Sequence, residues 1–124
     1  MSDFRAIVLG FHAENAGVPL EVAEARWNGL NQTFQICIAT GNPVVASGPV
    51  DELLHDVLQY TEDFEKYCLA IYGKRFHHRP EPKMGQPSGY MDTRKLAEQK
   101  FGPLSESVWP IGERPRWSFV YTLD

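Results

Sequence analysis

Residues 47–73, SGPVDELLHDVLQYTEDFEKYCLAIYG, carry the clearest helical pattern in the chain. Apolar residues recur there at steps of three and four positions, which places them on one stripe of an α-helix. Ser47 and Pro49 suit the start of a helix, and Gly73 suits its end. The stretch therefore predicts one long amphipathic helix. Its apolar stripe comprises Leu53, Val57, Tyr60, Phe64, Tyr67 and Ile71, and its opposite side carries Asp51, Glu52, His55, Gln59 and Glu62.

Two further helices are predicted before this stretch. The first runs from Asp3 to Ala16, where apolar residues recur at helical spacing. They are Phe4, Ile7, Val8 and Phe11. The second begins at Pro19 and ends before Gly41, because glycine closes a helix and Pro43 cannot continue it. Its stripe comprises Trp27, Leu30, Phe34, Cys37 and Ile38.

The region after Gly73 has a different composition. Residues 74–90 lose all periodicity and contain prolines, which discourage a helix, so we expect a long proline-rich loop. A short fourth helix follows from Met91 to Phe101. The segment 118–122, SFVYT, resembles a strand but has no clear partner, so we expect an extended aromatic tail packed on the helices. The sequence thus predicts a single all-α domain, 1–124, a small bundle of three main helices and a short fourth one.

Composition excludes several classes of protein. The chain has 124 residues and a formal net charge of −4, so broad attraction to nucleic acid is unfavourable. No apolar run approaches the ~20 residues that cross a bilayer, and the N-terminus lacks a signal-peptide layout, so we expect a cytoplasmic protein without membrane contact. The two cysteines, Cys37 and Cys68, cannot build a disulfide scaffold and fit as small core residues.

Histidines offer the nearest approach to a chemical site. His55 lies one helical turn after Asp51, so the two can share a divalent metal, with His77 or His78 as a further ligand. The difficulty is distance, because Gly73 lies about 27 Å along the helix from His55. The chain would have to return over that distance unless the helix breaks near Tyr60-Thr61. The alternative is a solvated acidic face with an ordinary surface histidine, and a histidine pair that only packs under the loop.

A second candidate surface combines arginines with aromatic residues. Such a cluster can attract an acidic partner, and exposed aromatic rings anchor protein interfaces. Its residues are Arg75, Arg79, Tyr90, Arg114, Arg116 and Trp117. The alternative is that the aromatic residues of this region complete the core of the small bundle.

A series of motifs begins with the stretch from Pro49 to His55, continues with Tyr60-Thr61, Phe64, Tyr67-Cys68 and Tyr72-Gly73, and ends with Phe76-His77-His78-Arg79-Pro80. In these motifs the chain resembles the glycine-rich-domain-containing-protein-like family. The resemblance covers roughly residues 27–110, and Phe101-Gly102 and Trp109-Pro110 continue it. Leu54 and Val57 stand where the family has a tryptophan and often a second histidine. The resemblance implies a helical domain and draws attention to Asp51, His55 and His78.

These observations favour a small non-enzymatic binding or accessory protein. It would contact another protein through the 74–90 loop and the aromatic and arginine-rich tail, and would need no cofactor. The alternative is a domain that binds zinc or another divalent metal through Asp51, His55 and His77 or His78 and that acts hydrolytically.

Overall fold

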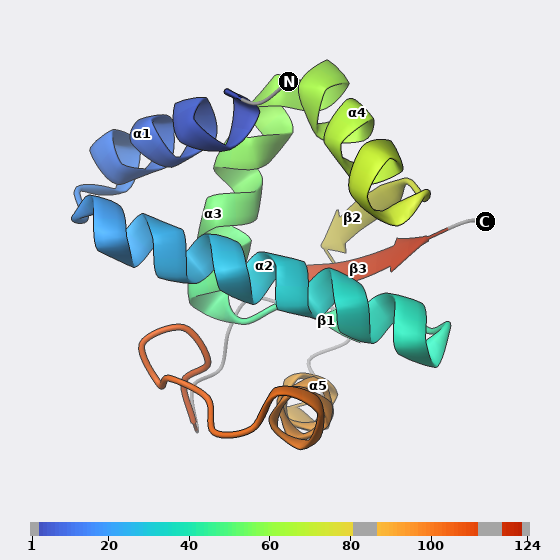
Figure 1. Cartoon of the computed structure of the whole chain (residues 1–124). Coiled ribbons are helices and arrows are strands. Elements are labelled where there is room, and N and C mark those ends of the chain that lie inside the picture. The colour runs from blue at the N-terminus through green and yellow to red at the C-terminus, as the bar shows by residue number, and fades with distance from the viewer. Residues whose placement is uncertain (1–2, 81–86, 112–117, 123–124) are drawn as a thin grey trace.

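The computed structural model describes residues 3–80, 87–111 and 118–122, and the protein is mostly helical with a small sheet (Figure 1). The helices are α1 (Phe4–Ala16), α2 (Leu20–Thr40), α3 (Gly48–Val57), α4 (Thr61–Tyr72) and α5 (Pro87–Phe101). A 3₁₀ turn, η1 (Leu58–Tyr60), lies between α3 and α4. The strands are β1 (Val44–Val45), β2 (Phe76–Pro80) and β3 (Ser118–Thr122).

Helix α2 crosses the middle of the molecule, with α1, α3 and α4 on one side and α5 on the other (Figure 1). Its predicted limits are confirmed, because it follows Pro19 and is closed by Gly41 at φ 69°. The predicted start of α3 is also confirmed. The Ser47 hydroxyl accepts a hydrogen bond from the Val50 backbone N–H at 3.2 Å and donates one to the Val108 carbonyl at 2.6 Å.

The prediction of a purely all-α fold is wrong, because the tail forms the central strand of a three-stranded sheet in the order β1-β3-β2. Strand β3 is antiparallel to both neighbours, with Val120 opposite Val44 on one side and His78 on the other. The expected 74–90 loop likewise contains β2 and the beginning of α5. Its residues 81–86 lie outside the described residues, as do 112–117 of the expected tail.

The predicted long helix is broken in two. Tyr60 has φ −108° and ψ 56°, outside the helical region, and α4 then starts again at Thr61 with Glu62 and Asp63 in its first turn. Acidic residues favour the N-terminus of a helix, which is consistent with a new helix here. Beyond the break, Phe64 and Cys68 are buried as predicted, whereas Ile71, which the predicted stripe included, is 60% exposed. The break lies near Tyr60-Thr61, where the metal hypothesis required the helix to break so that the histidines after Gly73 could approach His55.

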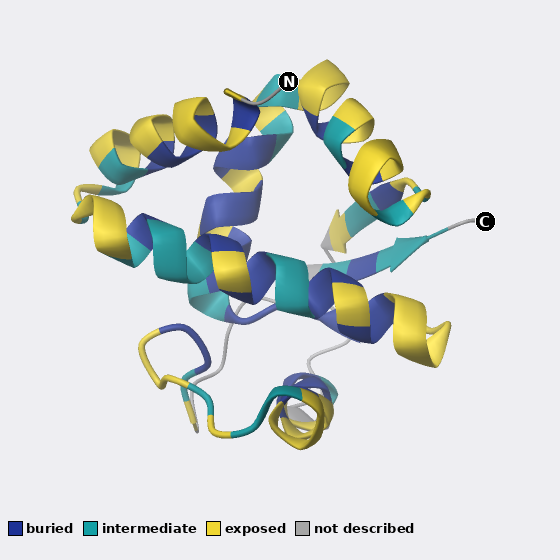
Figure 2. Cartoon of the chain, viewed as in Figure 1, coloured by how far each residue is buried: buried dark blue, intermediate teal, exposed yellow. Residues whose placement is uncertain are grey.

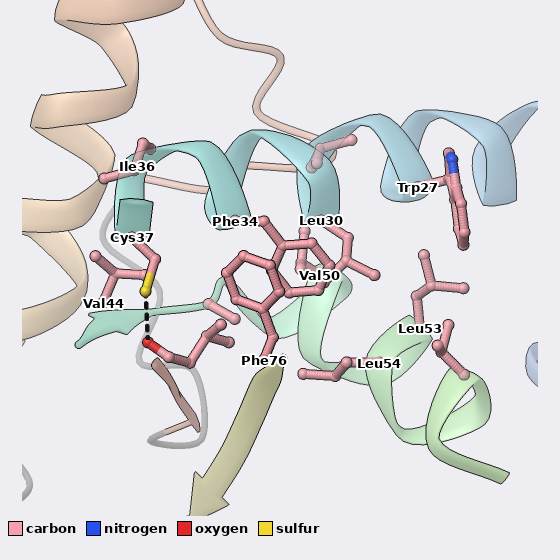
Figure 3. Packing of buried hydrophobic residues seen from close by; sticks show 14 of the residues in the cluster. Trp27, Leu30, Phe34, Ile36, Cys37, Val44, Val50, Leu53, Leu54 and Phe76 are labelled. Atoms are coloured by element: carbon pink, nitrogen blue, oxygen red, sulfur yellow. Dashed lines mark hydrogen bonds between the residues drawn. The ribbon is translucent and has the colours of Figure 1, made fainter. Parts of the chain in front are cut away.

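The core lies where α2 faces α3 and the sheet (Figures 2 and 3). Phe34 of α2 stacks on Phe76 of β2 with ring centroids 4.1 Å apart, and this contact fixes the strand against the helix. The Cys37 thiol lies 3.6 Å from the Val120 carbonyl and ties α2 to β3 (Figure 3). Trp109 is also buried, as expected if the aromatic residues of this region complete the core.

The buried face of α1 differs from the predicted one. On α1, Phe4 and Val8 are buried, but Ile7 and Phe11 are exposed, and the buried face instead includes Leu9 and His12.

No helix in the described ranges combines the length and the hydropathy that a bilayer crossing needs.

Candidate metal site

Helix α3 supplies two of the candidate ligands. Asp51 and His55 are four residues apart, so their side chains lie on the same face, about one helical turn from each other. His55 Nε2 is 3.4 Å from Asp51 Oδ1. The Ser47 cap and the first-turn proline fix where α3 begins, and hence which face these two residues occupy.

Strand β2 supplies the third ligand, and its alternation decides between the two adjacent histidines. Phe76 points into the core, so His78, two residues later, lies on the same face of the strand. His78 Nε2 is 3.2 Å from Asp51 Oδ1. His77 lies on the opposite face, where its ring stacks on Tyr121 with centroids 5.4 Å apart. His77 is therefore not part of the cluster, and His78 is.

Asp51, His55 and His78 form a compact group that can hold a metal ion. One ligand atom from each of the three lies within 4.8 Å of the others. The two imidazole rings meet edge to face, with centroids 5.3 Å apart. Both Nε2 atoms approach the same carboxylate oxygen, Asp51 Oδ1. The arrangement joins α3 to β2 at one point.

The three candidate ligands differ in their exposure to solvent. Asp51 is only 5% exposed, although the sequence placed it on a solvated side. That expectation is wrong, because the Asp51 side chain is buried and His78 of β2 lies against its carboxylate. The side chain of His55 is 48% exposed. A buried carboxylate must be compensated by positive charge or hydrogen-bond donors, and a metal cation is the strongest such partner.

A pocket of about 220 Å³ lies next to the group, and His78 is part of its wall. Cys68 also lines it. Burial raises the pKa of the Cys68 thiol to about 12. The thiol is therefore neutral at physiological pH and is unsuited to act as a nucleophile or a metal ligand, both of which require the thiolate. Its role in the pocket is that of a small apolar residue.

The structure contains a second polar cluster that sequence reasoning missed. His12 is fully buried, and its Nδ1 lies 2.7 Å from Asp56 Oδ2. Arg26 Nη1 donates to His12 Nε2 at 3.0 Å and to Glu52 at 2.9 Å. Since Arg26 can only donate, His12 Nε2 is an acceptor and Nδ1 carries the proton that is donated to Asp56. The only available signal was the spacing of four residues from Phe4 to Val8 to His12.

This second cluster joins three helices around a buried His12–Asp56 pair, while Glu52 at its edge is exposed. It connects α1, α2 and α3, and Asn15 Nδ2 satisfies the other oxygen of Asp56 at 2.9 Å. Its members on α3, Glu52 and Asp56, each directly follow a candidate metal ligand in the sequence. The two clusters therefore use adjacent faces of the same helix.

Of the predicted partner-binding residues, Arg75, Arg79 and Tyr90 lie in the described part of the chain. Tyr90 is 1% exposed and its hydroxyl donates to the Pro110 carbonyl at 2.8 Å, so its ring belongs to the core. Arg75 and Arg79 are exposed, and Arg75 pairs with Glu65 at 2.9 Å. Arg114, Arg116 and Trp117 lie outside the described residues. Contact with another protein through these residues stays a prediction.

Comparison with protein-family models, curated proteins and solved structures finds no match for this chain. The resemblance to the glycine-rich-domain-containing-protein-like family therefore stays a prediction as well. Inference about function rests on the geometry of Asp51, His55 and His78.

Proposed function

We propose that the protein binds a divalent metal ion, zinc in the first instance, through Asp51, His55 and His78. The observation that carries the proposal is the convergence of both imidazole Nε2 atoms on Asp51 Oδ1. The ligands come from two elements, α3 and β2, so an ion here also links the sheet to the helices.

The two separations from Asp51 Oδ1 support tetrahedral coordination. In a tetrahedral zinc site with bonds of about 2.0–2.1 Å, neighbouring ligand atoms lie about 3.3 Å apart. The separations from Asp51 Oδ1 are 3.2 Å to His78 and 3.4 Å to His55. The ligand atoms of the two histidines lie within 4.8 Å of each other, and the half-exposed His55 side chain is the ligand with most room to close around an ion.

The donor types favour a transition metal. Two imidazole nitrogens with one carboxylate suit Zn²⁺, and the same set with open positions suits Fe²⁺, whereas Mg²⁺ and Ca²⁺ prefer oxygen ligands. Elemental analysis of protein purified without added metal separates zinc from iron directly.

Three protein ligands leave one tetrahedral position for water. A zinc ion lowers the pKa of bound water towards neutrality and so generates a hydroxide nucleophile. The exposure of His55 gives solvent and substrate access to that side of the group. Hydrolysis is therefore the activity that we expect such a centre to support.

Calorimetric titration of metal-free protein with zinc tests the proposal. We expect one ion to bind per chain, and we expect Asp51→Asn to weaken binding by at least about 100-fold, because it removes the only anionic ligand. Asp63→Asn is the matched control, since Asp63 is an exposed acid in the first turn of α4. The proposal fails if no zinc binds, or if both variants bind it as the wild type does.

A further inference from the structure

The pocket beside His78 has a composition that indicates a specific kind of ligand. It lies between α4, β2 and the turn that follows α3. His78 belongs both to this pocket and to the group around Asp51. Leu58, another lining residue, follows His55 by three positions. The pocket therefore opens directly beside the position proposed for the metal.

The floor of the pocket is apolar and its rim is polar. Leu58, Phe64, Cys68 and Phe76 supply the apolar lining. Thr61, Glu65 and Arg75, which are exposed, line the solvent side, and His77 and His78 of β2 complete the lining. Ligand pockets commonly measure about 300–1,000 Å³, so a volume of about 220 Å³ suits a small molecule with a compact apolar group.

Arg75 gives the rim a group that recognises anions. Its Nε donates to Glu65 Oε2 at 2.9 Å, which holds the side chain along the pocket. No acceptor among the described residues takes a hydrogen bond from its two Nη atoms. A guanidinium presents its donors as a planar fork, which matches the two oxygens of a carboxylate or a phosphate.

We infer that this pocket binds a small organic anion, with its apolar group on Phe64 and Phe76 and its carboxylate or phosphate on Arg75. The inference rests on the proposed function, because such a ligand lies against His78 and so beside the metal. It names the substrate class for a hydrolytic centre: a small acid or phosphate ester with a compact apolar group.

Titration with benzoate and phenyl phosphate tests the inference, with benzyl alcohol as the uncharged probe. Both anions should bind zinc-loaded protein, and benzyl alcohol should bind at least about tenfold more weakly, because the charge-assisted hydrogen bonds to Arg75 are lost. Tighter binding of benzoate than of phenyl phosphate identifies a carboxylate ligand, and tighter binding of phenyl phosphate identifies a phosphate ligand.

Arg75→Gln should weaken the binding of both anions by at least about tenfold and leave the affinity for zinc unchanged. The matched control is Arg5→Gln, which removes an exposed arginine on α1, away from the pocket. Thr61→Phe should block the pocket and abolish anion binding, and a thermal melt of each variant verifies folding. The inference is overturned if Arg75→Gln binds the anions as the wild type does. If zinc does not bind, the metal proposal fails. Titration of the metal-free wild type and Arg75→Gln with the two anions then tests by itself whether the pocket binds anions.

Discussion

His78 Nε2 lies 3.2 Å from Asp51 Oδ1, so strand β2 and helix α3 meet at a buried carboxylate. The two residues are 27 positions apart in the sequence. They come together because the chain turns twice between them, at the 3₁₀ turn before Thr61 and at Gly73. The candidate site thus depends on the break that divides the long predicted helix.

Zinc should stabilise the folded protein. A ligand that binds only the folded state adds about 2.7 kcal/mol at one hundred times its dissociation constant. We expect a zinc-dependent rise in the melting temperature of the wild type and no rise in Asp51→Ala. Differential scanning calorimetry with and without zinc measures both, and an equal rise in the two proteins would show that zinc binds elsewhere.

Two glycines inside helices should respond in opposite directions to alanine. A Cβ at Gly29 would lie 2.5 Å from Val108 Cγ1 and 3.0 Å from Val50 Cγ2, so Gly29→Ala should cost about 1–3 kcal/mol of unfolding free energy through overpacking. A Cβ at Gly10 meets nothing within 4 Å. Gly10→Ala should therefore stabilise by about 1 kcal/mol through helix propensity. Urea denaturation compares them, and a stabilising Gly29→Ala would contradict the packing of α2 on Val108.

The buried His12–Asp56 pair should behave as a unit. Among the described residues, His12→Leu leaves the buried Asp56 with Asn15 as its side-chain partner, and we expect the free energy of unfolding to fall by about 3 kcal/mol. The double variant His12→Leu/Asp56→Leu should lose much less than the sum of the two single changes, because it removes both polar partners together. Urea denaturation of the wild type, the two single variants and the double variant completes this double-mutant cycle. Strict additivity would mean that the pair contributes no coupling.

The protein should lose stability in alkaline solution. Burial raises the pKa of Cys68 from 9.0 to about 12, and burial also raises the pKa values of Cys37, Tyr67 and Tyr72. These groups ionise in the unfolded chain while they remain neutral in the folded protein. The unfolded state therefore binds fewer protons above pH 9, and the free energy of unfolding falls as pH rises from 9 towards 12.

Cys68→Ala tests this assignment. It should flatten the fall in the free energy of unfolding over that pH range relative to the wild type, because one buried thiol no longer titrates. The free energy of unfolding is measured by urea denaturation at several pH values, with each variant normalised to its own value at neutral pH. An unchanged slope in Cys68→Ala would assign the alkaline loss to the other groups.

Local patterns in the sequence predicted the helices well because helices depend on local spacing. The limits of α2 and the cap at Ser47 followed from the residues themselves. The sheet did not, because β1 has only two residues and its partner Val120 is far along the chain from Val44. Without that pairing, the strand-like segment 118–122 had no visible neighbour.

The candidate site was predictable in part. Asp51 and His55 share a helix face, so their proximity followed from spacing alone. The choice of His78 over His77 required the strand β2, whose alternation puts Phe76 and His78 on the core side. The burial of Asp51 could not be predicted, because a helical pattern alone says nothing about contacts with distant parts of the chain. His12 was missed because a polar residue on an apolar face was not counted as core.

The most direct test compares His78→Ala with His77→Ala in calorimetric titrations with zinc. The two residues are adjacent on one strand, yet only His78 faces Asp51. We expect His78→Ala to weaken zinc binding by at least about 100-fold, while His77→Ala binds one ion per chain with wild-type affinity. Equal affinities in the two variants, or a larger loss in His77→Ala, would contradict a metal site that contains His78.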